Sequence, residues 1–245
     1  MKMRLDSLLV ERSLAETRSK ATGLIMSGSV FVNGRIITKS GTAVDSEAEI
    51  TLKETMPYVS RAGVKLSDAL DRFNVDVTDM VAIDIGSSTG GFTDVLLSRG
   101  VERVYAVDVG HGQLHWKLRN HDKVVILEGL NARFIDSSHV PEHCDIATFD
   151  VSFISLKLVV PQVLNLMKRP SALIALIKPQ FEAGRGQIGK GGIVRDPAVI
   201  EGVLEDMRSF FAATDLSVSG IIPSPIKGAK GNQEYLIHAV CGAMS

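Results

Sequence analysis

From Val81 onward the chain alternates short apolar runs with longer mixed stretches, and this pattern constrains the fold more than any other feature. Each run has the length of a buried strand, and several of the stretches between them have the apolar spacing of a helix. Such alternation predicts an α/β domain with a largely parallel sheet and helices on both faces. Seven runs are recognised, at residues 81–85, 104–107, 124–127, 146–149, 173–177, 218–222 and 235–240.

The first part of the chain has a different pattern and predicts a separate, small α+β domain. Leu5, Leu8 and Leu9 form one helical stripe, and a second short helix follows. Asn33 and Gly34 stand between apolar pairs, which is a strong signal for a two-residue β-hairpin turn. We therefore expect a first domain at residues 1–53, a linker at residues 54–60 and a second domain at residues 61–245.

Basic side chains are concentrated near the N-terminus, although the chain of 245 residues has a net charge of −1. Residues 1–39 contain seven lysines or arginines against three acidic residues. A local basic surface can bind RNA even when the whole chain is nearly neutral. An ordinary solvated helix face is the alternative. The candidate RNA-binding residues are Arg4, Arg18, Lys20 and Arg35, with Arg61 at the start of the second domain.

Composition gives no indication of a membrane or secreted protein. The longest apolar run, residues 172–177, is far shorter than the roughly 18 residues of a membrane helix. The N-terminus lacks the apolar stretch of a signal peptide. We expect a cytoplasmic protein with no membrane partner, in which Cys144 and Cys241 are free thiols. We expect no metal site and interpret the spaced histidines as surface residues, namely His111 with His115 and His139 with His143.

A glycine-rich turn follows the first predicted strand of the second domain, where ligands bind in open α/β sheets. Its glycines, at positions 86, 90 and 91, do not match the G-x-G-x-x-G of dinucleotide sites, which argues against a dehydrogenase. Asp84 before this turn favours a nucleoside without phosphates. Asp108 ends the second strand, where a carboxylate can accept hydrogen bonds from both ribose hydroxyls. We predict an adenosyl cofactor; the alternative is a tight turn without a ligand.

Several spaced motifs give essentially the whole chain a resemblance to the TlyA family. They are residues 60–66 (SRAGVKL), 84–92 (DIGSSTGGF), 149–153 (FDVSF), 177–182 (IKPQFE) and 231–235 (GNQEY). That family is described both as hemolysin A and as a ribosomal RNA 2′-O-methyltransferase. The C-terminal part resembles FtsJ-type enzymes, which implies a Rossmann-like, seven-stranded methyltransferase sheet. Residues 4–52 resemble the S-four-type RNA-binding domain of a ribosomal protein.

The resemblance also implies site residues. FtsJ-type enzymes carry a Lys-Asp-Lys-Glu set around the target ribose, which falls here on Lys65, Asp150, Lys178 and Glu234. A lysine amine becomes a base when burial and a second cation lower its pKa. We assign hydroxyl activation to Lys178 because it ends an apolar strand, with Lys65 as the second charge and the two carboxylates orienting the amines. S-adenosylmethionine is expected at Asp84, Gly86, Ser88, Gly90, Gly91 and Phe92, with Asp108 at the ribose and Asn131 near the adenine.

The expected substrate is ribosomal RNA or an assembled ribosomal subunit, methylated on a cytidine. A shorter type within the family is associated with the large subunit, and the five residues after the last predicted strand resemble that type, so we expect the large subunit. One feature departs from relatives, because residues 56–59 (MPYV) stand where Arg-Ala-Trp-Val can occur. Two alternatives remain: an RNA-binding protein with a catalytically inert methyltransferase fold, and a hemolysin that acts indirectly. The sequence leaves the oligomeric state open.

Overall fold

The computed structural model describes residues 1–53 and 56–242, and this part of the chain forms two compact units. The boundary between the units falls between Met56 and Pro57. Two residues of the expected linker pack on the second unit. Tyr58 Oη donates a hydrogen bond to Ser67 Oγ at 3.0 Å, and Val59 N donates to a side-chain oxygen of Asp94 at 2.9 Å. Positions 54 and 55 of that linker lie outside the described residues.

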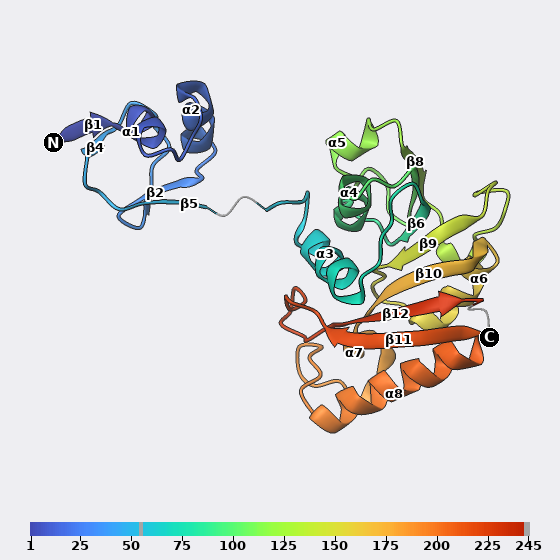
Figure 1. The fold of residues 1–245 in the computed structure, drawn as a ribbon. Coiled ribbons are helices and arrows are strands. Elements are labelled where there is room, and N and C mark those ends of the chain that lie inside the picture. Colours follow the sequence, from blue (N-terminus) through green and yellow to red (C-terminus); the bar gives the residue numbers. More distant parts are fainter. Residues whose placement is uncertain (54–55, 243–245) are drawn as a thin grey trace. The chain divides into compact units, whose positions relative to one another are not determined.

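The first unit packs two helices against short antiparallel strands (Figure 1). Thr17 caps the second helix, because its hydroxyl accepts a hydrogen bond from Lys20 N at 3.2 Å. Asn33 and Gly34 form the predicted hairpin turn, and both have the positive φ that a type I′ turn requires. The elements are β1 (Lys2–Arg4), α1 (Leu5–Glu11), α2 (Arg18–Met26), β2 (Val30–Val32), β3 (Arg35–Ile36), β4 (Ala43–Asp45) and β5 (Ile50–Leu52).

The second unit contains one large sheet, and the seven predicted strands are confirmed within residues 57–242. The strand order is β11-β12-β10-β9-β6-β7-β8. β12 runs antiparallel to both of its neighbours, and the pairings among β10, β9, β6, β7 and β8 are parallel. The strands are β6 (Val81–Ile85), β7 (Arg103–Asp108), β8 (Val124–Glu128), β9 (Cys144–Phe149), β10 (Met167–Ile177), β11 (Leu216–Pro223) and β12 (Tyr235–Cys241).

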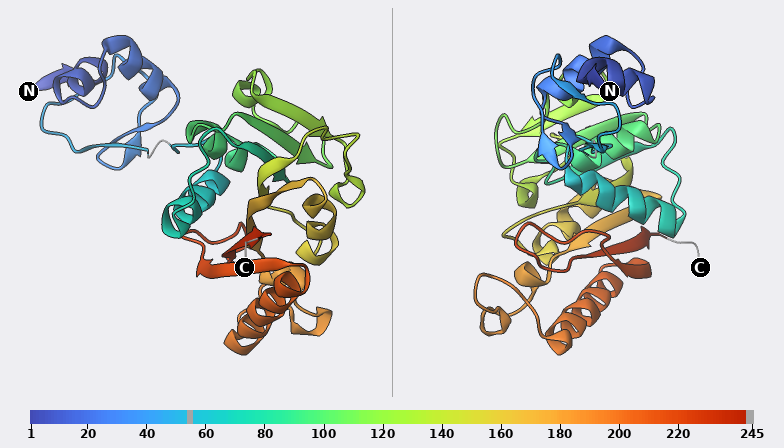
Figure 2. Two further views of the ribbon diagram at one scale, coloured as in Figure 1. Left: turned by 45° about the vertical axis from the view of Figure 1, so that its right-hand side comes forward. Right: turned by 90° about the vertical axis from the view of Figure 1, so that its left-hand side faces the viewer.

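Helices cover both faces of this sheet, as the alternation of the sequence predicts (Figure 2). Along β6, Ile83 and Ile85 pack into a core with α8, whereas Ala82 packs into a second core with α3 and α4. Asp196 caps α8 by accepting a hydrogen bond from Ala198 N at 2.9 Å. The helices are α3 (Arg61–Phe73), α4 (Gly91–Ser98), α5 (Trp116–Arg119), α6 (Val160–Leu164), α7 (Pro179–Glu182) and α8 (Pro197–Ala213), with short 3₁₀ turns at Ala132–Phe134, Leu156–Leu158 and Arg185–Gln187.

Candidate active site

Several strand ends meet at one edge of the large sheet. β6, β9 and β10 are parallel, so their carboxyl ends lie at this edge, and Ile85 pairs with Phe149 in the last register positions of β6 and β9. β12 runs in the opposite direction, so its first residue, Tyr235, pairs with Ile177, the last residue of β10. The topology thus gathers the polar residues that flank these strands in the sequence, namely Asp150, Lys178 and Glu234.

Two buried ion pairs form at this edge. Lys178 Nζ lies 2.6 Å from Asp150 Oδ1 and donates to Ser152 Oγ at 2.9 Å. Lys65 reaches the edge from α3, and its Nζ lies 2.5 Å from Glu234 Oε2. The side chains of Lys65 and Lys178 are only 10% and 9% exposed. Burying a charge is costly unless it is paired, so each carboxylate offsets the cost of burying the amine beside it.

The turn before β12 fixes the position of Glu234. Gly228 lies beside the carboxylate, and a Cβ built at Gly228 would overlap Glu234 Oε1. The side chain of Asn232 is buried. Its Oδ1 accepts a hydrogen bond from Val194 N, and its Nδ2 donates one to the Gly192 carbonyl oxygen, both at 2.9 Å. These contacts connect two loops beside Glu234, and the Glu234 carboxylate accepts a hydrogen bond from Lys65.

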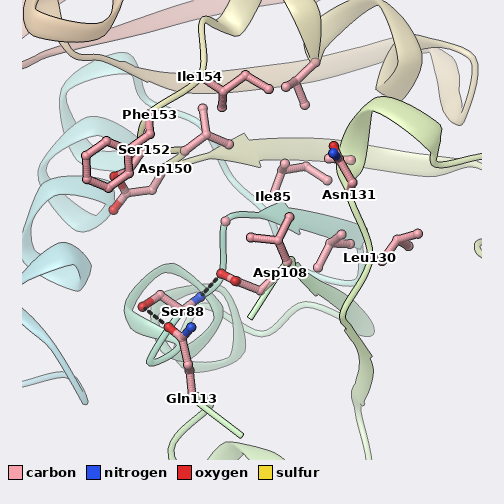
Figure 3. Close-up of a pocket in the computed structure, with 16 residues that line it drawn as sticks. Ile85, Ser88, Asp108, Gln113, Leu130, Asn131, Asp150, Ser152, Phe153 and Ile154 are labelled. Atoms are coloured by element: carbon pink, nitrogen blue, oxygen red, sulfur yellow. Dashed lines mark hydrogen bonds between the residues drawn. The ribbon is translucent and has the colours of Figure 1, made fainter. Parts of the chain in front are cut away.

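A cavity of about 340 Å³ opens at this edge, and Asp150, the partner of Lys178, is among its lining residues (Figure 3). Gly86 forms its floor with a φ of +81°, and a Cβ there would lie 2.7 Å from the carbonyl oxygen of Asp150, so glycine allows this close approach. The carboxylate of Asp108 accepts backbone hydrogen bonds from Ser88 at 2.8 Å and from Gly110 at 2.7 Å. The remaining lining is mostly apolar, and includes Ile85, Val107, Val109, Leu130, Val151, Ile154 and Val159.

The structure places only part of the predicted cofactor set at this cavity. Gly86, Ser88, Asp108 and Asn131 line it, as does Asp150 of the Lys-Asp-Lys-Glu set. The other predicted positions lie behind the lining. Gly90 and Gly91 allow close packing, since a Cβ at Gly90 would meet Leu114 and Leu118, and one at Gly91 would meet Ser60 and Ala62. Phe92 is buried in the core shared by α3 and α4.

Asp84 is fully buried below the cavity floor. One carboxylate oxygen accepts a hydrogen bond from the Thr93 hydroxyl at 2.7 Å and the other from the Thr148 hydroxyl at 2.9 Å. Burial raises the pKa of Asp84 to about 6, because the desolvation of the charged form outweighs the hydrogen bonds from the two hydroxyls, which lower the pKa. In this structure the side chain therefore links β6 to α4 and β9 rather than lining the cavity.

Sequence reasoning assigned no role to several residues at the cavity. Gln113 lies on the loop after β7, where its side-chain oxygen accepts a hydrogen bond from Ser88 Oγ at 3.2 Å (Figure 3). Phe153 is 87% exposed and has a φ of +65°, which is uncommon for a large side chain. Its ring centroid lies 5.1 Å from that of Phe181. Phe153 could have been considered because it belongs to the motif FDVSF at residues 149–153. For Gln113, the sequence offered only the neighbouring glycines, which indicate a loop.

The predicted RNA-binding residues divide between the two units. In the first, the side chains of Arg4 and Arg18 both bond to Asp6, Lys20 pairs with Glu16, and Arg35 is exposed on β3. In the second, the guanidinium of Arg61 donates to the Lys227 carbonyl at 3.3 Å. All five side chains are on the surface of their own unit.

Three further features concern metal ligands, membrane helices and the cysteines. Among residues 1–53 and 56–242, no group of three or more His, Cys, Asp or Glu side chains is arranged to hold a metal ion. No helix in those ranges combines the length and apolar character needed to cross a membrane. Both cysteines are free and buried, and desolvation raises the pKa of the Cys144 thiol to about 12.

Comparison with known proteins gives two family matches and close relatives. Residues 58–240 match the FtsJ-like methyltransferase family, and residues 3–50 match the S4 domain. The chain is 50% identical to the candidate rRNA methyltransferase YqxC of Bacillus subtilis, over 97% of this chain and 85% of the relative. It is 41% identical to the 16S/23S rRNA (cytidine-2′-O)-methyltransferase TlyA of Mycobacterium tuberculosis, over 96% of this chain and 88% of the relative.

A third relative and a solved structure extend the same match. The 23S rRNA (cytidine-2′-O)-methyltransferase TlyA of Campylobacter jejuni is 31% identical, over 97% of this chain and 99% of the relative. The structure of a candidate hemolysin from Streptococcus thermophilus is 45% identical, with a TM-score of 0.76, and the match covers 98% of this chain and 88% of that one. The chain therefore belongs to the FtsJ-like methyltransferase family, in the TlyA and hemolysin A group, and carries an S4 domain at its N-terminus.

Proposed function

We propose that the protein methylates the 2′-hydroxyl of a cytidine ribose in ribosomal RNA, with S-adenosylmethionine as the methyl donor. One observation carries this proposal: two buried lysine–carboxylate pairs stand at the strand ends that border a nucleoside-sized cavity. Ribose oxygen is a weak nucleophile, so a site for its methylation needs groups that orient the hydroxyl and take its proton. Lys178 and Lys65, each aligned by its own carboxylate, meet that need.

The cavity has the composition expected for an adenosyl cofactor. Its volume lies within the range of about 300–1,000 Å³ typical of small-molecule sites. Apolar side chains suit an adenine ring, and the Asp108 carboxylate retains lone pairs that can accept hydrogen bonds from ribose hydroxyls. No lysine or arginine is among the described residues that line the cavity, which disfavours a cofactor that carries a pyrophosphate. When bound, S-adenosylmethionine supplies an electrophilic methyl group on a sulfonium.

The chain's own residues would then act on the RNA. Lys178 is proposed to bind the target hydroxyl at Nζ and to relay its proton: as the methyl group is transferred, the amine passes one proton to the Asp150 carboxylate and takes up the hydroxyl proton, while Ser152 helps to hold the amine in place. Lys65 would supply a second positive charge that attracts the ribose–phosphate backbone, and Glu234 fixes its position. Because the two amines are buried and paired before the substrate arrives, little reorganisation is needed during the reaction.

The S4 domain is proposed to provide most of the affinity for RNA. Arg4, Arg18, Lys20 and Arg35 are candidates for phosphate contacts, with Arg61 on the methyltransferase unit as a fifth. For the target we propose the large subunit. The names of both TlyA relatives include 23S rRNA, and only the M. tuberculosis enzyme is also named for 16S rRNA. A cytidine in 23S rRNA is therefore the simplest shared substrate.

The test is a methyl-transfer assay on separated ribosomal subunits. Purified large and small subunits lacking the modification are each incubated with the protein and labelled S-adenosylmethionine, and the label is located by mass spectrometry of nuclease fragments. We expect ribose methylation of a cytidine in large-subunit RNA, and none with a Lys178→Met control. Label on a base, or no label on either subunit, would overturn the proposed reaction. Equal labelling of small-subunit RNA would overturn only the choice of subunit.

The same protein preparation tests the binding-only alternative. Calorimetric titration should show binding of S-adenosylmethionine and S-adenosylhomocysteine and no binding of NAD. A catalytically inert fold would bind RNA but would methylate neither the large nor the small ribosomal subunit.

A further inference from the structure

One carboxylate in the S4 domain organises two arginines. Asp6 lies on the first turn of α1, and its side chain is 3% exposed. Its Oδ1 accepts a hydrogen bond from Arg4 Nε at 3.0 Å and another from Ser7 N at 2.9 Å. Its Oδ2 accepts from Arg4 Nη2 at 2.7 Å and from Arg18 Nε at 3.0 Å. The two guanidinium groups therefore meet at one buried acceptor.

The arginines themselves remain open to solvent. The side chain of Arg4 is 52% exposed and that of Arg18 is 59% exposed. The bonds to Asp6 use Nε and Nη2 of Arg4 but only Nε of Arg18. A guanidinium carries five N–H groups in a fixed fork, so both side chains keep donors for a further ligand. Gly41 packs closely against Arg4, since a Cβ built there would lie only 3.1 Å from Arg4 Nη1, so the absence of a side chain at Gly41 leaves room for the guanidinium.

The carboxylate is held in its charged form. The hydrogen bonds and charge of Arg4, reinforced by Arg18, keep the pKa of Asp6 well below its usual range despite the burial. The cluster thus has two cations facing the solvent and one anion below them. Such an arrangement fixes two guanidinium planes near each other, and guanidinium–phosphate pairs are strong when the fork is already aligned.

We propose that Asp6 is a positioning residue that holds Arg4 and Arg18 as a joint binding site for RNA phosphate oxygens. The inference rests on the proposed function, in which the S4 domain supplies RNA affinity. It assigns to Asp6, an acidic residue, a positive contribution to binding a polyanion. Asp6 touches no RNA in this arrangement and acts only through the two arginines.

Because Asp6 is negatively charged, a positioning role for it can be distinguished experimentally from an effect of net charge on RNA binding. If the arginines act only through their net charge, replacing Asp6 by a neutral residue removes a repulsive charge and strengthens RNA binding. If Asp6 positions them, the same replacement releases two long side chains and weakens RNA binding. The two models therefore predict effects of opposite sign.

The experiment compares full-length Asp6→Asn with Glu11→Gln, an exposed acid at the end of the same helix. RNA affinity is measured against salt concentration with a large-subunit rRNA fragment. We expect Asp6→Asn to raise Kd about tenfold and to lower the salt slope by roughly one phosphate contact, about 0.7–0.9 in log–log terms. Glu11→Gln should leave Kd unchanged or slightly lower. Equal or tighter binding by Asp6→Asn, with an undiminished slope, overturns the inference.

A second variant keeps the test valid if Asp6→Asn disturbs folding. The double substitution Arg4→Lys and Arg18→Lys preserves both charges but removes the Nε donors that bond to Asp6. Positioning predicts a similar loss of affinity with a raised KM and an unchanged kcat, whereas net charge alone predicts no loss. Unaltered affinity in this variant also overturns the inference. A wild-type protein that methylates no rRNA refutes the proposed function instead, whichever way Asp6→Asn changes RNA binding.

Discussion

The S4 domain and the methyltransferase domain both place lysine or arginine against carboxylates, but they bury opposite partners. In the S4 domain Asp6 is buried and its two arginines are more than half exposed. In the methyltransferase domain the lysines themselves are buried, with Lys65 and Lys178 each about nine-tenths covered. The cations of these ion pairs are therefore accessible to solvent in the S4 domain and largely removed from solvent in the methyltransferase domain.

This difference in exposure determines what each cluster can do. Exposed cations attract phosphates along an RNA, and their contribution falls as salt rises. Buried pairs are screened much less, and they act on a single group brought into contact with them. We therefore expect RNA affinity and methyl transfer to be separable, with the first depending on the S4 domain and the second on the Lys-Asp-Lys-Glu set.

The largest effect should come from Lys178→Met. Removing the amine that we propose to take the hydroxyl proton should lower turnover by about 10²–10⁴-fold, the usual contribution of a general base. RNA affinity and its salt dependence should stay within about twofold of wild type, because the exposed cations are untouched. Single-turnover methylation and fluorescence anisotropy measure the two quantities. Near-normal turnover would remove Lys178 from the reaction and leave the two clusters without distinct roles.

A smaller effect is expected from deleting the S4 domain. A chain that begins at Met56 should lose RNA affinity on the order of 100-fold and most of its salt dependence. Its affinity for S-adenosylhomocysteine should be unchanged, because the described residues that line the cavity belong to the second unit. Cofactor titration serves as the folding control. If the shortened chain methylates subunits as well as the full protein, RNA affinity does not depend on the S4 domain.

The next effect concerns the cofactor half of the site. Asp108→Ala should weaken S-adenosylhomocysteine binding by roughly 1.5–3 kcal/mol for each charge-assisted bond lost, about 10- to 150-fold in Kd. RNA binding should not change. Asp122→Ala, an exposed acid before β8, is the matched control and should bind the cofactor normally. Unchanged cofactor affinity in Asp108→Ala would show that this carboxylate serves only Ser88 and Gly110.

Much of the fold could be predicted because buried parallel strands appear in sequence as continuous apolar runs. All seven strands of the large sheet were predicted from such runs, including the antiparallel β11 and β12, whereas the hairpin was predicted from its Asn33–Gly34 turn signal. The pairing of β1 with β4 was missed, because three-residue strands with mostly exposed side chains leave no periodic pattern.

Only part of the candidate site could be predicted from the sequence. The strand-end residues Asp150 and Lys178 could be placed at one edge because parallel strands end together. Gln113 and Phe153 lie on irregular loops, where no periodicity reports which way a side chain points. The glycine run was ambiguous for a different reason. Gly86 borders the cavity. At Gly90 and Gly91, at the start of α4, a Cβ would overlap neighbouring side chains, so these glycines are explained by packing.

The smallest effect sharpens the comparison through two buried carboxylates, Asp6 and Asp84. Asp6 is held by cations and its pKa is lowered, so its contribution to stability is present at neutral pH and is lost on acidification. Asp84 is held by the hydroxyls of Thr93 and Thr148, and its pKa is raised to about 6. Stability from Asp84 is therefore complete below about pH 4, the unfolded pKa, and declines as pH rises through about 6.

Asp84→Asn should remove this penalty, since an amide has no charge to desolvate and can bond to both hydroxyls. We expect the variant to exceed wild type at pH 8 by up to about 3 kcal/mol in unfolding free energy, the value of a shift of roughly two pKa units. The difference should shrink to nothing near pH 4. Urea unfolding across this pH range measures it, with Asp6→Asn expected to be destabilised at neutral pH instead. An advantage for Asp84→Asn that does not depend on pH would mean that Asp84 is already protonated at pH 8.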